Sequence, residues 1–440
     1  MENNKLNKMN IDSGNKKFSP PLILPEEAFE DDYIVATYFY RMESSTDVYE
    51  KAKSFAIGQT IGTWIPVPGV TSQMSKKYGG KVVSVYDIPP IELTTDLPDF
   101  TSHIIQIAFP DENFAPQFPM LLTTLTGNDV STSAQVKLID IKFSKKFLSA
   151  FKGPRFGIDG IYNYFGIEKR PIVLNMIKPC LGYTASEGAG IFKEIAMGGV
   201  DIIKDDELFA NTNYNSIQER VKAYTKVVKE VQEEIGHKTI YCVNITDRFD
   251  KCLEHAHSAV EAGAGMLMIN FVTAGISTLQ ALAEDTRIKV PIFAHYAGAG
   301  FMTESPYTGF SSPILLGKLS RLAGADICLF SSPYSTYPFL KRRYNQIADI
   351  QRLPLGDLLP TMPAVGGGVH PNSAEKIIKD LGIEVVLGVG GAILGHPLGP
   401  TEGARAMMQA AEALGKGIKL SEIAEIKGYE SLKISLKKWH

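Results

Sequence analysis

Cysteine is scarce in this sequence, and the scarcity limits what can crosslink the chain or bind a metal ion. Only four of the 440 residues are cysteines, and no two of them form a C-x-x-C pair. We therefore expect neither a disulfide framework nor a thiolate zinc site, and a reducing, cytoplasmic location is the default expectation.

Long apolar runs and an excess of charge are also absent. No run reaches the roughly 18 apolar residues that span a bilayer, so we expect no membrane partner. The polar residues 1–19 lack the apolar segment of a secretory signal and are expected to form a disordered tail. Lys and Arg number 45 against 48 Asp and Glu, a formal net charge of −3, so no nucleic-acid partner is expected.

The region before residue 152 contains four β-branched and aromatic runs and two segments with helical spacing. The runs are 32–40, 81–88, 102–110 and 134–143, and the helical segments are 46–60 and 118–125. Two pairs of strands, each with one helix, predict a small ferredoxin-like α+β domain over 20–151. Gly153, Pro154 and Gly157 interrupt the periodicity and indicate a linker.

From residue 171 onward, eight short apolar runs alternate with amphipathic helical segments. The runs are 171–178, 200–206, 239–246, 265–271, 290–296, 325–331, 359–368 and 384–391. Such continuous apolar strands indicate burial on both faces. Eight βα units predict an α/β fold, a (β/α)8 TIM barrel over 152–440 with a C-terminal helical extension. A doubly wound open sheet is the alternative.

Polar residues follow the expected barrel strands at their carboxyl ends, where barrel enzymes place their active sites. They are Lys178, then Lys204, Asp205, Asp206 and Glu207, then Asn244, Asn270 and His295. A charged residue at a single strand end can simply mark where the chain reaches water. Because that explanation requires five strand ends to coincide, the set favours a catalytic site.

The K-D-D-E run at the second strand has two interpretations. Lys204 and Asp206 face the same way on a strand, and Glu207 can turn inward where the strand ends. Two carboxylates suit Mg2+, which binds one or two protein carboxylates together with water and substrate oxygens. A neighbouring ammonium opposes that cation, so Lys204 either forms a salt bridge with the acids or loses its positive charge.

Glycines end the last two barrel strands. Gly366, Gly367 and Gly368 follow the seventh strand, and Gly390 and Gly391 follow the eighth. Exposed amides there, beside a short helix, form the phosphate site of many barrels. The alternative is that these glycines only make tight turns between helices and strands.

Five segments resemble the RuBisCO large-subunit superfamily, and the resemblance extends from about Asp32 to the C-terminal helices. The segments read GPRFGIDGI, IKPCLG, GGVDIIKDDE, AVGGGVHP and GVGGAILGHPLGP. The resemblance implies an α+β N-terminal domain followed by a (β/α)8 barrel, in a homodimer or higher homo-oligomer. In that family, N-terminal residues of one chain complete the barrel site of its partner.

The resemblance also bears on the charge of Lys204. In the family, the lysine of K-D-D-E reacts with CO2 to form a carbamate, which binds Mg2+ together with the Asp and the Glu. The matching residues are Lys204, Asp206 and Glu207. The implied cofactors are therefore Mg2+ and CO2 as a lysine carbamate.

Several positions depart from the true carboxylases. Lys178 matches the family's first catalytic lysine, whereas Cys180 replaces the second. His295 is kept, but Tyr296 replaces the arginine that grips a phosphate, and no histidine lies near Leu329. These changes imply a RuBisCO-like protein of the form IV group that does not carboxylate ribulose bisphosphate.

Two further departures support that expectation. The segment 331–339 lacks the loop lysine of the carboxylases, and Gly58 replaces an N-terminal glutamate. The residues of one phosphate-binding end, with the asparagine that reaches the partner's site, are retained. They are Thr63, Trp64, Asn128, Gly367, Gly368, Gly390 and Gly391.

The opposite end of the site has lost its charge, because Tyr296 and Leu329 stand where the family has arginine and histidine. We therefore expect a phosphorylated small-molecule substrate with one phosphate and a less charged far end. The basic run 341–343 is the alternative, as the holder of a second phosphate.

The resemblance implies an Mg2+-dependent enolase or isomerase acting on a sugar-phosphate-like monophosphate. Lys178 is expected to have a lowered pKa and to act as base or acid, and His295 to move a proton or hold a substrate hydroxyl. The alternative is a decarboxylase or C–C hydrolase of a branched oxo-acid sugar phosphate. An alternative of another class is a non-catalytic ligand-binding or regulatory paralogue.

Two branches of the RuBisCO-like proteins share segments with this sequence. GHKTIYCVNIT, GKLSRLAGAD and FSSPYS resemble the methionine-salvage enolases, and NITD and GHPLGPTEGA resemble the branch of photosynthetic bacteria. The salvage enolases use an N-terminal-domain lysine as base, and Asn128 occupies the matching position. Lys178 is then the remaining candidate base.

Overall fold

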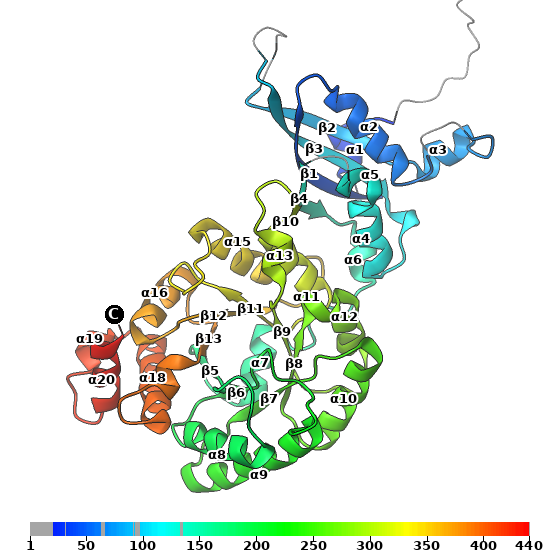
Figure 1. Cartoon of the computed structure of the whole chain (residues 1–440). Coiled ribbons are helices and arrows are strands. Elements are labelled where there is room, and N and C mark those ends of the chain that lie inside the picture. The colour runs from blue at the N-terminus through cyan, green and yellow to red at the C-terminus, as the bar shows by residue number, and fades with distance from the viewer. Residues whose placement is uncertain are drawn as a thin grey trace, which may run out of the picture.

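Two regions with different strand arrangements make up the chain, a mixed sheet with helices and a parallel barrel (Figure 1). The computed structural model describes residues 21–30, 32–62, 67–90, 92, 97–132 and 135–439. The two regions lie next to each other and are also joined by a strand pair, because a short segment of the barrel region adds to the N-terminal sheet.

The N-terminal sheet has five strands in the order β10-β4-β1-β3-β2. Their bounds are β1 Tyr33–Glu43, β2 Lys81–Ile88, β3 Phe100–Pro110, β4 Gln135–Lys142 and β10 Gly309–Phe310. β1 pairs antiparallel with β3 and β4, and β10 pairs parallel with β4. The first four strands lie where the sequence predicts strands. β10 was not predicted, since two residues show no periodicity.

The helices of this region cover the sheet and connect its strands. They are α1 Pro25–Ala28, α2 Val48–Gly58, α3 Ser72–Tyr78, α4 Phe118–Thr126, α5 Asn128–Ser131 and α6 Lys145–Ser149, with the 3-10 turn η1 Asp111–Asn113. α2 starts where the Asp47 carboxylate accepts the N–H groups of Tyr49 and Glu50. Its buried Phe55 packs edge-on against Tyr40 of β1. α2 and α4 agree with the predicted helices, whereas α3 was not predicted.

Eight parallel strands close into a barrel in the order β11-β12-β13-β5-β6-β7-β8-β9. Their bounds are β5 Ile172–Met176, β6 Ile202–Lys204, β7 Ile240–Asn244, β8 Met266–Asn270, β9 Ile292–His295, β11 Ile327–Ser331, β12 Met362–Gly366 and β13 Val386–Val389. Each strand lies within one of the eight predicted apolar runs. The barrel prediction is therefore confirmed, and the open doubly wound sheet is excluded.

Helices surround the barrel and extend beyond it at the C-terminus. They are α7 Gly157–Phe165, α8 Ala185–Ala196, α9 Ile217–Ile235, α10 Phe249–Glu261, α11 Phe271–Ala274, α12 Ile276–Glu284, α13 Ala299–Thr303, η2 Ile314–Leu319, α14 Ser320–Leu322, α15 Lys341–Arg352, α16 Pro371–Leu381, α17 Gly391–Leu394, α18 Pro400–Gly415, α19 Leu420–Ile423 and α20 Glu430–Lys438. α18, α19 and α20 lie together outside the barrel (Figure 1).

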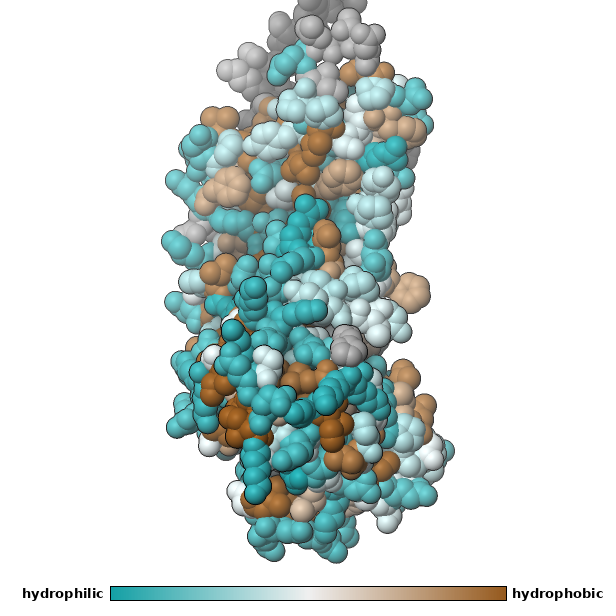
Figure 2. Space-filling model, turned by 90° about the vertical axis from the view of Figure 1, so that its left-hand side faces the viewer, coloured by the Kyte–Doolittle hydropathy of each residue, from teal (hydrophilic) through white to brown (hydrophobic). Residues whose placement is uncertain are grey.

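The barrel interior is filled by apolar side chains, and the polar side chains of the site project from the carboxyl ends of the strands. Alternate residues of each strand point inward, among them Leu174, Ile202, Cys242 and Met268, and all are buried. Ile161 of α7 belongs to the same cluster and closes the amino end of the barrel. The surface seen in Figure 2 is a mixture of polar and apolar residues. Within the described ranges, no helix has the length and apolar character to cross a membrane.

Candidate active site

A pocket of about 290 Å³ opens at the carboxyl ends of the barrel strands. Residues from six strand ends and from the loop after β11 line it. They are Met176, Lys178, Glu207, His295, Tyr296, Leu329, Thr336, Tyr337, Gly366, Gly367, Gly368, Gly388, Gly390 and Gly391. Many of the predicted site residues are thus brought together in one cavity of the size of a small metabolite.

Lys204 ends β6 and is completely buried. Its ammonium donates to the backbone oxygen of Asp205 at 2.8 Å and lies 3.6 Å from Glu207 Oε2. Burial lowers the pKa of Lys204, although the nearby carboxylates of Glu207 and Asp206 oppose the shift. The lysine is therefore more easily deprotonated than an exposed one.

Asp205 turns away from the pocket and anchors the turn that follows β6. Its carboxylate accepts hydrogen bonds from Arg220 Nε at 3.1 Å, from the Tyr241 hydroxyl at 2.9 Å and from the Asn244 N–H at 2.9 Å. Asp205 and Arg220 are both fully buried. This network was not predicted, because Arg220 and Tyr241 are distant in sequence and carry no motif.

Lys178 follows β5 and forms an ion pair with Asp206, whose side chain is fully buried. The same ammonium lies 3.1 Å from the Cys180 sulfur. Burial lowers the pKa of Lys178, but the hydrogen bonds and charge interactions with Asp206 and Cys180 together outweigh burial and raise the pKa above the ordinary lysine value. The expected lowering of this pKa is therefore wrong, since the Asp206 carboxylate stabilises the ammonium.

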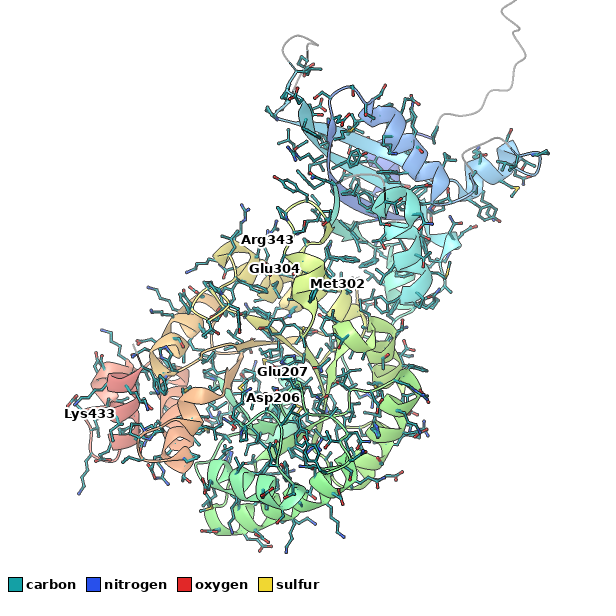
Figure 3. The ribbon with its side chains drawn as sticks, in the orientation of Figure 1. Asp206, Glu207, Met302, Glu304, Arg343 and Lys433 are labelled. Carbon is teal, nitrogen blue, oxygen red and sulfur yellow. The ribbon has the colours of Figure 1, made fainter. Side chains whose placement is uncertain are left out.

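Glu207 and His295 meet at the centre of the barrel mouth (Figure 3 labels Glu207 and Asp206). Glu207 Oε2 lies 3.6 Å from both Lys204 Nζ and His295 Nε2. His295 Nδ1 accepts the Ala297 N–H, so the neutral ring carries its proton on Nε2, on the side of Glu207. Burial and the nearby Lys204 charge hold the pKa of His295 well below the usual range, which keeps the ring neutral.

Two asparagines fix the backbone beside these acids. Asn270 Nδ2 donates to the Glu207 carbonyl at 2.8 Å, and Asn244 Nδ2 donates to the Asp206 carbonyl at 3.2 Å. The Asn244 Oδ1 is itself held by the Thr246 hydroxyl. Asn244 and Asn270 therefore orient the turn that carries Asp206 and Glu207.

The four acidic and basic side chains have a net charge of zero when Lys178 and Lys204 are protonated and Asp206 and Glu207 are ionised. Among the described residues, no group of three or more His, Cys, Asp or Glu side chains is arranged to hold a metal ion. Two carboxylates and a buried lysine amine meet at the site instead. This donor set fits a hard divalent cation only if Lys204 supplies an oxygen ligand.

The predicted phosphate-binding glycines lie at the ends of β12 and β13 and line the same pocket as Glu207. Gly367 and Gly368 have φ values of +89° and +78°, which favour glycine. A Cβ on Gly390 would lie 2.8 Å from Met176 Sδ, whereas a Cβ on Gly391 would meet nothing within 4 Å. Gly391 thus leaves open space at the start of the short helix α17.

The far end of the pocket is aromatic and apolar. Tyr296 stacks on His295 with 5.5 Å between ring centroids and packs edge-on against Phe339. Leu329 lines the pocket beside it.

The basic run 341–343 is directed elsewhere. Lys341 pairs with Asp380, and Arg343 lines a separate cavity together with Lys137 and Glu304. Figure 3 shows Arg343 and Glu304 away from Asp206 and Glu207, toward the N-terminal region. The alternative role of this run at a second phosphate is therefore not supported.

Among the described residues predicted for the site, Lys204, Asp206 and Asn128 do not line this cavity. Lys204 and Asp206 are fully buried and pair with the lining residues Glu207 and Lys178. Asn128 starts α5 in the N-terminal region, where it is exposed and lines no wall of the pocket. Thr63 and Trp64 lie outside the described residues. Thr336 and Tyr337, in contrast, line the pocket without having been predicted, because no charge or spacing marks them in the loop.

Comparison with known proteins assigns both regions of the chain to one protein family. The family "Ribulose bisphosphate carboxylase large chain, catalytic domain" matches residues 157–331 and 347–439, and the corresponding N-terminal domain matches 25–147. A ribulose bisphosphate carboxylase-like protein from Archaeoglobus fulgidus is 42% identical over 90% of this chain and 91% of its own. The chain belongs to the RuBisCO large-chain family.

The named relatives of this RuBisCO-like protein include enolases. A 2,3-diketo-5-methylthiopentyl-1-phosphate enolase from Bacillus cytotoxicus is 37% identical over 91% of this chain and 97% of its own. Among solved structures, a RuBisCO-like protein from Alicyclobacillus acidocaldarius has a TM-score of 0.86 and 34% identity, covering 93% of this chain and 100% of its own. A dimeric archaeal RuBisCO from Hyperthermus butylicus has a TM-score of 0.83 and 29% identity, covering 93% and 96%.

Proposed function

We propose that this RuBisCO-like protein is an Mg2+-dependent enolase-type enzyme that removes a proton next to the carbonyl of a sugar-phosphate-like monophosphate. The observation that carries the proposal is the fully buried Lys204 at the end of β6, with Asp206 and Glu207 directly after it. A protein that only binds a ligand gains nothing from burying a lysine amine beside two carboxylates at a barrel mouth, since such burial is unfavourable.

Carbamylation of Lys204 agrees with the charges at the site. The ammonium first loses one proton, the neutral amine then attacks CO2 to form the N–C bond, and a second proton is released, so the side chain changes from +1 to −1. Binding of one Mg2+ restores the net charge of zero that Lys178, Lys204, Asp206 and Glu207 have on their own. Lys204 as a carbamate, Asp206 and Glu207 would hold Mg2+, which would act as a Lewis acid toward the substrate carbonyl.

Lys178 is the candidate general acid or base. Its ammonium reaches into the pocket, and its ion pair with Asp206 keeps it protonated. Lys178 can therefore accept a substrate proton only after Asp206 has taken another partner. His295, neutral and protonated on Nε2, is suited to donate a hydrogen bond to a substrate oxygen.

The glycine wall is the proposed phosphate site. Gly367, Gly368, Gly390 and Gly391 line the same pocket as Lys178, and backbone amides at such turns bind anions. Thr63, Trp64 and Asn128 of a partner subunit would complete this end in a homodimer. The exposed position of Asn128, outside the pocket of its own chain, is consistent with that arrangement.

The apolar far end supports a substrate with one phosphate and an uncharged tail. Tyr296 and Leu329 offer aromatic and apolar surface rather than cations. The phosphate of 2,3-diketo-5-methylthiopentyl-1-phosphate, the substrate in the name of the Bacillus relative, is accompanied by a thioether, so this compound is the first substrate to test. Asn128 occupies the position of the base lysine of the salvage enolases. A decarboxylase or C–C hydrolase is therefore the second candidate function.

Solvent deuterium exchange tests the proposal. The protein, supplied with Mg2+ and bicarbonate in deuterated water, should incorporate deuterium into a monophosphorylated diketone or ketose, and Glu207→Gln should not. Release of CO2 from an oxo-acid sugar phosphate would instead identify the decarboxylase. Binding without exchange or bond cleavage, across such a panel, would contradict both and favour a regulatory paralogue.

A further inference from the structure

The loop 332–340, between β11 and α15, lies directly on the proposed phosphate-binding glycines. Thr336 and Tyr337 of this loop line the pocket. A Cβ on Gly368 would lie 3.6 Å from both the backbone nitrogen and Cγ2 of Thr336, and a Cβ on Gly367 would lie 3.2 Å from Ser335 Cβ. The Thr336 amide and side chain are therefore next to the space in which a phosphate would bind.

A buried serine holds this loop from the inside. Ser331 ends β11 and is completely buried. Its hydroxyl donates to the Tyr337 carbonyl at 2.8 Å and is 2.6 Å from the Ser335 hydroxyl. One side chain thus connects the barrel strand to two positions on either side of Thr336.

An ion-paired cluster holds the same loop from the outside, where α15 and α16 contact each other. The Tyr334 hydroxyl donates to Asp380 Oδ2 at 2.7 Å, and Lys341 Nζ donates to Asp380 Oδ1 at 2.8 Å. The Asp380 side chain is only 10% exposed, and Lys376 lies over the Tyr334 ring. Because Asp380 is charged and largely shielded, its hydrogen bond from Tyr334 is of the stronger kind.

We propose that Ser331, Tyr334 and Asp380 are positioning residues that hold the loop 332–340 as a fixed wall, with Thr336 as a phosphate-binding residue against Gly368. The proposal rests on the phosphate site of the proposed function. The loop contains no lysine that could bind a second charged group of the substrate. Its position at the pocket is instead set by these hydrogen bonds before a ligand binds. Preorganisation of this kind reduces the conformational entropy that binding must overcome.

Two measurements on the full chain test the proposal. Hydrogen exchange of the amides in 332–340, followed by mass spectrometry without ligand, should accelerate at least fivefold in Ser331→Ala, Tyr334→Phe and Asp380→Asn. The dissociation constant for inorganic phosphate, measured by calorimetry, should rise about three- to tenfold in the same variants. Tyr344→Phe is the matched control, since its buried hydroxyl has no hydrogen-bond partner among the described residues.

The outcomes separate the loop from the phosphate site. Unchanged exchange in all three variants, or acceleration equal to that of Tyr344→Phe, would overturn the positioning role and leave the proposed function standing. Faster exchange with unchanged phosphate affinity would overturn the role of Thr336 at the phosphate. If the wild-type protein binds no phosphate at millimolar concentration, the phosphate site itself is wrong, and the role of Thr336 fails with it.

Discussion

Replacing Arg220 should destabilise the turn that carries the proposed metal-binding residues. Arg220 and Asp205 are both fully buried, and the Asp205 carboxylate also accepts hydrogen bonds from Tyr241 and Asn244. Arg220→Met leaves that carboxylate buried without its cation, and such a loss lowers the free energy of unfolding by about 3–5 kcal/mol. Tyr241→Phe removes the hydroxyl that donates to the charged Asp205 and accepts from Arg220 Nε at 3.0 Å, so we expect a loss of about 1.5–3 kcal/mol.

Urea unfolding followed by circular dichroism measures both losses, with Tyr344→Phe as the control hydroxyl removal. The double variant Arg220→Met with Asp205→Asn should be more stable than Arg220→Met alone, because it no longer buries an unpaired charge. A wild-type free energy of unfolding in Arg220→Met would refute the reasoning. A double variant whose loss of free energy of unfolding equals the sum of the losses of the two single variants would also refute it.

Other expected outcomes concern the pocket and the pH dependence of stability. Gly391→Val should weaken binding of a monophosphate at least tenfold, because the valine side chain would fill the open space at α17. Calorimetry measures the affinity and circular dichroism checks the fold, and an unchanged affinity would place the phosphate elsewhere. Purified protein with ribulose bisphosphate, Mg2+ and labelled bicarbonate should fix no label, and clear incorporation would show that Tyr296 and the lysine-free loop do not prevent carboxylation. Burial raises the pKa of Asp326 from 3.8 to about 6 against three backbone N–H donors, so the folded chain binds more protons than the unfolded chain in this range. The contribution of Asp326 to the free energy of unfolding should therefore be highest below pH 3.8 and fall by roughly 3 kcal/mol as the pH rises to 6. This fall should be absent in Asp326→Asn, and a fall in this variant equal to that of the wild type would contradict the prediction.

The elements that could be predicted are those with a strong local pattern. Eight apolar runs marked the barrel strands, since a strand buried on both faces needs apolar residues at nearly every position. β10 and α3 were missed, because a two-residue strand and a polar surface helix have no such pattern. The strand-end rule likewise brought Lys178, Glu207 and His295 to one pocket.

What the sequence does not reveal depends on distant partners. In the sequence, Asp205 is a third acid of the K-D-D-E run. In the structure, its carboxylate binds Arg220 from α9 and faces away from the pocket. The pKa of Lys178 is raised rather than lowered, since its interactions with Asp206 and Cys180 together outweigh its burial. Thr336 lines the pocket from a loop that Ser331 and Asp380 contact, and no sequence pattern marks these contacts.

The carbamate on Lys204 is the central claim, and carbon-13 NMR of the protein with labelled bicarbonate tests it most directly. With Mg2+ present, the wild-type protein should show one slowly exchanging carbamate resonance, and Lys204→Met should show none. No carbamate resonance in the wild-type protein, or an equal resonance in Lys204→Met, would contradict the account and leave Lys204 as a simple partner of Glu207.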